Sequence, residues 1–325
     1  MTTRSVCIVG PGAIGGMMAL KFKRAGYAVS ALARAAKVAE IAAHGMTLHE
    51  DGVTTVDTFR ASADATSLGP HDLVIVAVKY GALPEVVHQL PALSKPETPW
   101  VFVLNGVPWW FLDHIGGACR GKRLASVDPH DVLRRTVPES RIVWGVIHCT
   151  VSIRPDGSLS HDALNRLHLG RPSGGLDQLA DITGAFRAAG YNADATARIH
   201  DEIWQKLQNN VTYNPVSAVT MATTDLMIGD PLVRELMVNV ADETRAIGEA
   251  LGIAGGPSGD ERFPKTAVRS ASTSMLADMQ RGRRLELDAL IASVVELSAI
   301  TGVPAPFTRA LYGLVRLRDR TAAKL

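Results

Sequence analysis

The chain contains little cysteine, few aromatic residues, almost no excess charge and no long apolar run. Its three cysteines show neither a paired nor a metal-ligand spacing, which argues against a disulfide framework and fits free thiols in a reducing cytoplasm. The net charge of +2, with acids and bases interspersed, argues against a general nucleic-acid or membrane-surface partner. No stretch reaches the length of a membrane span. We therefore expect a cytoplasmic protein that binds neither nucleic acid nor membrane.

The first half of the chain alternates short β-rich runs with helical ones. Its 325 residues, 46% of them apolar, are enough for two domains with sizeable cores. We predict strands over 5–10, 27–33, 72–79 and 99–106. We predict helices over 13–26, 35–45 and 82–93. This alternation predicts an α/β domain with a Rossmann-type, doubly wound parallel sheet.

The pattern changes in the second half. The run 141–153, followed by the turn "RPDGSL" at 154–159, predicts an antiparallel hairpin or meander. From about residue 200 only helical periodicity remains. The predicted helices are 200–222, 231–252, 263–301 with breaks, and 305–320. We expect an α/β domain over 1–196 and an all-helical C-terminal domain over 197–325.

The stretch "GPGAIGG" places Gly10, Gly12 and Gly15 at the G-x-G-x-x-G spacing, between a predicted strand and a predicted helix. In a dinucleotide site the first glycine allows a tight turn, the second lets the backbone approach a pyrophosphate, and the third lets the helix pack closely. Ala13 and Ile14 then lie at the helix N-terminus, where amides face the anion. The alternative is a tight strand-to-helix turn without a ligand.

The end of the second strand bears on the choice of cofactor. An NAD site usually has an acid about 20 residues after the glycines, yet residues 28–36 contain none. Arg34 occupies that region, with Lys37 one turn later. A cation there suits the 2′-phosphate of NADP(H), whereas the alternative is an ordinary surface arginine.

A row of polar residues crosses the stretch "WQKLQNNVTYNP" at 204–215. Lys206, Asn210 and Asn214 are four apart and share one helix face. Pro215 would leave the Val211 carbonyl unpaired and open the helix beside this row. The row therefore faces either a small polar molecule or, in the alternative reading, water.

Taken together, these residues resemble the ketopantoate reductase family (2-dehydropantoate 2-reductases) over nearly the whole chain. The resemblance rests on "GPGAIGG", Arg34, "AVKYGAL" (77–83), "VLNGV" (103–107), "WQKLQNNVTYNPVSA" (204–218) and "TSMLADMQRGRRLELD" (273–288). It implies NADPH-dependent reduction of a small 2-keto acid, by default 2-dehydropantoate to pantoate. It also implies a cleft between a Rossmann domain and a helical domain.

The resemblance also implies roles for individual residues. Lys206 matches a catalytic lysine and Glu286 an acid that reaches the active site. Asn210, Asn214 and Ser274 match residues that contact the substrate. Further matches near the nicotinamide end of the cofactor are Lys79 and Asn105, both at carboxyl ends of predicted strands, and Asn105 is counted among the substrate contacts as well.

These residue types suit hydride reduction of a ketone. Negative charge develops on the carbonyl oxygen, so a proton donor such as Lys206 would lower the barrier. The hydride comes from a nicotinamide, so no metal is required. Ser274 and Glu286 are twelve residues apart and lie about 120° out of phase on one straight helix. If both line the cleft, either the helix bends, with Gly282 the weak point, or the substrate lies along the helix.

Some features depart from the family pattern and keep alternatives open. Ser272 stands where many relatives have lysine, "ELDALIAS" lacks a glycine found after the acid, and Trp109 and Trp110 lie beside the site strand. A related 2- or 3-hydroxyacid dehydrogenase is therefore an alternative, and a non-catalytic NADP(H) sensor is another. Relatives include monomers and dimers, so a homodimer is possible.

Overall fold

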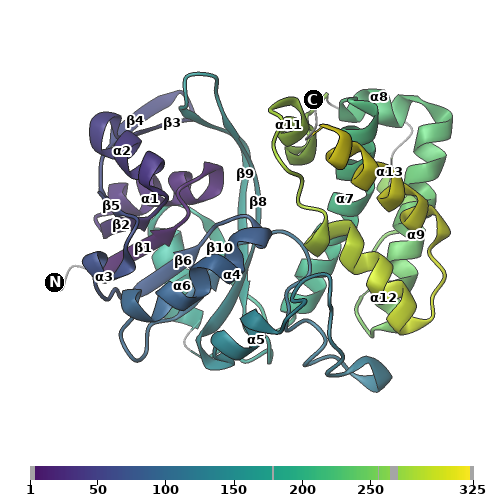
Figure 1. Ribbon diagram of the computed structural model, residues 1–325, viewed down its shortest axis with the longest axis horizontal. Coiled ribbons are helices and arrows are strands. Elements are labelled where there is room, and N and C mark those ends of the chain that lie inside the picture. The colour runs from purple at the N-terminus through teal and green to yellow at the C-terminus, as the bar shows by residue number, and fades with distance from the viewer. Residues whose placement is uncertain (1–3, 178, 255, 264–269, 323–325) are drawn as a thin grey trace. The chain divides into compact units, whose positions relative to one another are not determined.

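The computed structural model describes residues 4–177, 179–254, 256–263 and 270–322 (Figure 1). The chain divides into two compact units. The first comprises Met1–Leu104 and Val132–Ile199, and the second comprises Asn105–Asp131 and His200–Leu325. Residues 105–131 thus belong with the C-terminal half, although the segments on either side of them belong to the first unit.

Six neighbouring parallel strands form one side of the sheet in the first unit. Their spatial order, starting at the edge of the sheet, is β5 (Arg60–Ser62), β2 (Ala28–Leu32), β1 (Ser5–Val9), β6 (Leu73–Val76), β7 (Trp100–Phe102) and β8 (Ile142–Ile153). Counted along the chain, this is the 3-2-1-4-5-6 order of dinucleotide-binding folds. The central strands β1 and β6 are almost fully buried, as their continuous apolar runs indicate. The predicted Rossmann-type sheet is confirmed.

The sheet is mixed rather than purely parallel, because four further strands extend it. β8 and β9 (Leu159–Gly170) form the predicted antiparallel hairpin, and β9 also pairs in parallel with β3 (Met46–Glu50) and β10 (Asn192–Ala195). β3 pairs with β4 (Val53–Asp57) across Asp51 and Gly52, which both have positive φ. An Asp-Gly pair of this kind is a strong hairpin signal that the sequence analysis missed.

The helices of the first unit are short except for three. They are α1 (Ala13–Arg24), α2 (Ala35–His44), α3 (Ala65–Leu68), α4 (Leu83–Val86), α5 (Val132–Thr136) and α6 (Leu179–Ala188), with 3₁₀ turns η1 (Tyr80–Ala82), η2 (Val87–Leu93) and η4 (Glu139–Arg141). The prediction of one helix over 82–93 is wrong. Residues 83–86 form a single α-turn and the rest is 3₁₀, because Pro91 cannot donate a backbone hydrogen bond.

The second unit contains helices and no strands among its described residues. They are η3 (Gly117–Cys119), α7 (Ile199–Thr220), α8 (Thr224–Gly229), α9 (Pro231–Ala250), α10 (Gly259–Arg262), α11 (Ser274–Gln280), the π-helix η5 (Asp288–Ala292), α12 (Ser293–Thr301) and α13 (Pro306–Ala322). The predicted helix 263–301 is broken after Gln280, and its part over 264–269 lies outside the described residues. None of the described helices is long and apolar enough to span a membrane.

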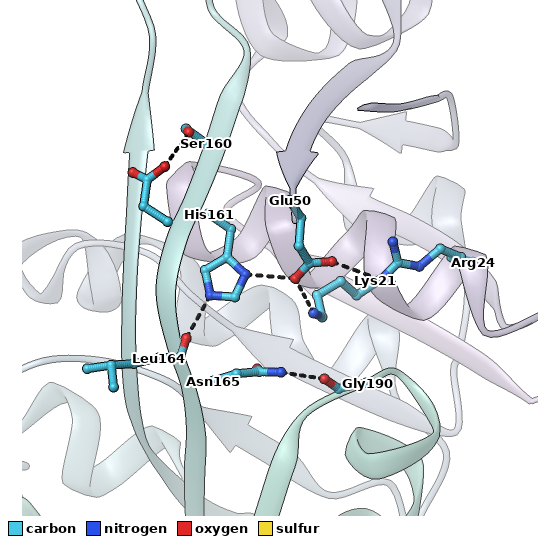
Figure 2. Close-up of polar contacts among 9 residues, drawn as sticks. Lys21, Arg24, Glu50, Ser160, His161, Leu164, Asn165 and Gly190 are labelled. Carbon is cyan, nitrogen blue, oxygen red and sulfur yellow. Dashed lines mark hydrogen bonds and ion pairs between the residues drawn. The ribbon is translucent and has the colours of Figure 1, made fainter. Parts of the chain in front are cut away.

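An ion cluster holds α1 against the β3 and β9 strands (Figure 2). The Glu50 carboxylate lies 2.5 Å from Lys21 Nζ, 2.9 Å from Arg24 Nη2 and 2.7 Å from His161 Nδ1. Burial alone would raise the pKa of Glu50, but the hydrogen bonds from these three side chains lower it to about 2. The Lys21 side chain is only 2% exposed, so its ammonium group has this carboxylate as a partner in place of water. The cluster therefore fixes the helix that follows the glycine loop.

Candidate functional site

The glycine loop has the close packing that its spacing predicts. Gly10 follows β1 with φ +88° and its amide donates to the Leu32 carbonyl at 3.0 Å. A Cβ atom on Gly15 would lie 2.2 Å from the Gly10 carbonyl oxygen, so the first turn of α1 packs directly on the strand-end backbone. Any side chain at position 15 would push the helix away.

Gly12 differs from the other two glycines of the motif because it faces open space. A Cβ atom there would meet no atom within 4 Å, and Gly12 is the N-cap residue of α1. The first turn of α1, which includes Ala13 and Ile14, carries no acidic residue. Helix N-terminal amides lack partners within the helix and carry a partial positive charge, so this end suits a phosphate group.

Arg34 and Lys79 lie at the same edge of the sheet as the glycine loop. The last residue of β1, Val9, pairs with Leu32 of β2 and Val76 of β6, so the chain leaves all three strands at one level. Arg34 is exposed and caps α2, and its carbonyl accepts from two amides of that helix. Lys79 is exposed and precedes η1.

Lys37 and Lys79 have different surroundings near this edge. Lys37, the second cation of the predicted phosphate site, lies 2.6 Å from the Glu40 carboxylate. A Cβ atom on Gly10 would lie 2.6 Å from the Val78 side chain, so the residue before Lys79 rests on the glycine loop. The seven candidate cofactor residues of the first unit, which are Gly10, Gly12, Ala13, Ile14, Gly15, Arg34 and Lys79, therefore gather at one end of the parallel sheet.

In the second unit, α7 carries Lys206, Asn210 and Asn214 on successive turns. Lys206 and Asn210 are half-buried, and Asn214 is 6% exposed. The opposite side of α7 packs in the core through Trp204, which is fully buried. The helix continues through Pro215 to Thr220 as one element.

The other amides of this stretch have a different partner. Gln208 is fully buried, and its side-chain oxygen accepts from Arg262 Nη2 at 2.6 Å. Arg262 Nη1 donates to the Asn209 side chain at 2.5 Å. Gln208 and Asn209 therefore join α7 to α10, a role that the sequence analysis did not predict.

Ser274 and Glu286 do not share a helix. Ser274 is exposed and is the first residue of α11, which ends at Gln280. Glu286 is half-buried in the non-helical segment that leads into η5. Gly282 lies in this segment with φ +61°, so the predicted break at Gly282 is confirmed.

The Asn105 loop contacts the π-helix that follows Glu286. Asn105 is half-buried and comes three residues after β7. The next residue, Gly106, has φ +94°, and a Cβ atom there would lie 2.2 Å from the Ala289 carbonyl oxygen. The Val107 amide donates to the same oxygen at 2.7 Å. Gly106 therefore brings the Asn105 and Glu286 segments together, although the sequence analysis gave it no role.

Aromatic packing anchors the first turns of α7. His200 Nε2 lies 3.1 Å from the Phe111 carbonyl oxygen, and its ring meets Trp110 edge-on. Burial lowers the pKa of His200 from 6.5 to about 4, so the ring is neutral and donates to this carbonyl. Trp110 is buried at 2% exposure. A Cβ atom on Gly248 of α9 would lie 2.2 Å from Trp204 Nε1, so α9 meets this tryptophan without a side chain between them.

The described residues contain no group of three or more His, Cys, Asp and Glu side chains that could hold a metal ion. Among the histidines, His161 belongs to the Glu50 cluster. The rings of His148 and His168 lie edge-to-face, with centroids 6.2 Å apart. The polar groups of the candidate site are thus amides, hydroxyls, lysine, arginine and the single carboxylate of Glu286.

Comparisons with known proteins agree with this arrangement. The chain matches the family model of ketopantoate reductase PanE/ApbA over residues 6–174, and the model of the C-terminal part of that family over residues 198–319. It is 36% identical to a curated 2-dehydropantoate 2-reductase of Mesorhizobium japonicum, over 96% of both chains.

Solved structures show the same fold. A crystal structure from Ralstonia solanacearum MolK2 has 40% sequence identity and a TM-score of 0.92, with 99% of each chain covered. A D-mandelate dehydrogenase, solved with NADH and anilino(oxo)acetate, has 18% identity and a TM-score of 0.83, with 98% of this chain and 99% of that chain covered. The second likeness concerns the fold alone. The chain belongs to the ketopantoate reductase family, a family of oxidoreductases that act on CH–OH groups.

Proposed function

We propose that the protein reduces a 2-keto acid to the 2-hydroxy acid with NADPH, and that its substrate is 2-dehydropantoate, which becomes pantoate. The observation that carries the proposal is the row Lys206, Asn210 and Asn214 on one face of α7, in a chain that is 36% identical to a 2-dehydropantoate 2-reductase over nearly its full length. The product would then enter pantothenate biosynthesis.

The residues of the first unit fit a dinucleotide. Gly12 leaves room for a pyrophosphate at the α1 N-terminus, and Gly15 keeps the helix close to the strand that presents it. Exposed Arg34 would bind the 2′-phosphate of NADP(H), since Lys37 is engaged by Glu40. Lys79 would hold the nicotinamide end. When bound, this cofactor supplies the hydride that reduces the ketone carbon.

The residues of the second unit supply the proton and hold the substrate. Lys206 donates a proton to the carbonyl oxygen as negative charge develops there, so the ketone becomes an alcohol. Asn210 and Asn214 hydrogen-bond substrate oxygens without adding charge, and Ser274 donates to the substrate carboxylate. Glu286 accepts from the substrate hydroxyl.

Absorbance of NADPH, followed with a panel of keto acids, tests the proposal. The panel contains 2-dehydropantoate, pyruvate, 2-oxoisovalerate, benzoylformate and a 3-oxo acid. We expect the highest kcat/KM with 2-dehydropantoate. Preference for another 2-keto acid would replace the substrate and keep the reaction, whereas binding of NADPH without reduction of any member would contradict the proposed function.

A further inference from the structure

Two hydroxyl groups, one of them fully buried, join the substrate row of α7 to the start of α11. Ser217, one turn after Asn214, is fully buried, and its Oγ lies 2.5 Å from Thr273 Oγ1. Ser217 Oγ also lies 2.8 Å from the Asn214 carbonyl oxygen. Thr273 is the residue immediately before Ser274 and is the N-cap of α11.

The direction of each hydrogen bond follows from the chemistry of the groups. A carbonyl can only accept, so the Ser217 hydroxyl donates to Asn214. Ser217 must then accept from the Thr273 hydroxyl. Thr273 Oγ1 in turn accepts from the Leu276 amide at 3.0 Å. Each donor in this series of three hydrogen bonds has one acceptor, so the series connects the Asn214 backbone to the first turn of α11 without an unsatisfied group.

A second attachment holds the segment just before Thr273. The Thr224 amide donates to the Ala271 carbonyl, and the Ala271 amide donates to Thr224 Oγ1, each at 3.0 Å. These bonds tie residue 271 to the first turn of α8 on both its donor and its acceptor. The start of α11 is therefore fixed at two points, residues 271 and 273.

We propose that Ser217 and Thr273 are positioning residues for substrate binding, which set the place of Ser274 relative to Asn214. The inference rests on the proposed function, because it assigns both of those residues to the substrate. An apolar contact at this point would hold α7 and α11 together without fixing their register, since the hydrophobic effect is non-directional. A hydrogen bond between two short side chains weakens steeply when its geometry changes.

The test compares Ser217→Ala and Thr273→Val with the wild-type protein. We expect the KM for the keto acid to rise about five- to tenfold, with a smaller change in kcat, as for the loss of one net hydrogen bond that acts on binding. The Kd for NADPH should stay the same. Hydrogen–deuterium exchange of the first turn of α11 should become faster, because the cap is lost or loses its partner.

Two further variants separate positioning from simple destabilisation. Thr244→Val removes a fully buried hydroxyl that bonds back to its own helix α9 at 2.7 Å, and it should lower stability without moving the KM. Thr273→Ser keeps the hydroxyl and should restore the wild-type KM. The double variant Ser217→Ala/Thr273→Val should be no worse than the poorer single variant, because both remove one interaction.

The outcomes are distinct. An active wild-type protein whose KM is unchanged in Ser217→Ala and Thr273→Val would overturn the positioning role and leave the proposed function intact. An equal rise in KM in Thr244→Val would overturn it too, since general loosening would then explain the effect. A wild-type protein that reduces no keto acid would overturn both proposals.

Discussion

The two units hold their candidate residues by different means. In the first unit the proposed dinucleotide site is formed mainly by backbone, through three glycines and the ends of parallel strands. In the second unit side chains on separate helices must be brought into register by contacts such as Ser217 with Thr273. A local sequence motif can therefore describe the first arrangement, whereas the second depends on pairs that are distant along the chain.

The sharpest test of this division is Lys206→Ala in the second unit. If the two units divide chemistry from cofactor binding, kcat should fall by about a thousandfold, because a proton donor is lost. The Kd for NADPH should change little. The exposed neighbour Gln205, replaced by alanine, is the matched control on the same helix. Unchanged kcat in Lys206→Ala would refute the proton-donor role.

The Glu50 cluster is the place where the first unit also depends on side chains. Glu50→Gln leaves Lys21 buried without its carboxylate, so the free energy of unfolding should fall by about 3 kcal/mol. Urea denaturation measures this change. The double variant Lys21→Met/Glu50→Gln should recover most of it, since no unpaired buried charge remains. Equal loss in both variants would show that the charge of Lys21 is not the cause.

Acid should weaken the aromatic anchor of α7. Burial lowers the pKa of His200 from 6.5 to about 4, so below pH 6.5 the unfolded chain takes up a proton that the folded protein refuses. The free energy of unfolding should therefore fall by about 2 kcal/mol between pH 7 and pH 5, and the loss should be complete near pH 4. His200→Gln should remove this slope from urea denaturation curves, and a slope that persists would assign it to other groups.

The smallest expected effect concerns cofactor choice in the first unit. Arg34→Ala should raise the Kd for NADPH about tenfold through loss of a charge-assisted bond to the 2′-phosphate, and should leave the Kd for NADH unchanged. Lys37→Ala is the matched control, because Lys37 already pairs with Glu40, and its effect should be smaller. An equal rise in the Kd for NADPH and for NADH would show that Arg34 does not contact the 2′-phosphate.

The sequence predicted the parts of the fold that local patterns determine. The glycine spacing, the buried strands and the 154–159 turn all lie within short windows, and the structure contains the loop, the parallel core and the hairpin there. The β3–β4 hairpin was missed because Asp51 and Gly52 were not weighed as a turn. The prediction of one helix over 82–93 was wrong because it rested on apolar periodicity and neglected the effect of Pro91.

The site was less accessible to the same reasoning. Spacing grouped Lys206, Asn210 and Asn214 on one helix face. It could not show that the neighbouring amides of Gln208 and Asn209 bind Arg262, which lies 53 residues or more further along the chain. Gly106 looked like one glycine among many until its contact with Ala289 was seen. Such pairs are chosen by the packing of helices, and a single sequence does not record which helices pack together.

The contact of Gly248 with Trp204 carries a lesson for protein engineering. Replacing helix glycines with alanine is a common route to greater heat resistance, because it restricts the unfolded chain, with a gain of about 0.5–1 kcal/mol each. Gly184 in α6 and Gly313 in α13 have no atom within 4 Å of a new methyl group and suit this treatment. At Gly248 the methyl group would meet the indole of α7 at 2.2 Å and displace the helix that carries Lys206. A thermostabilised enzyme should therefore keep Gly248, as it should keep Gly15.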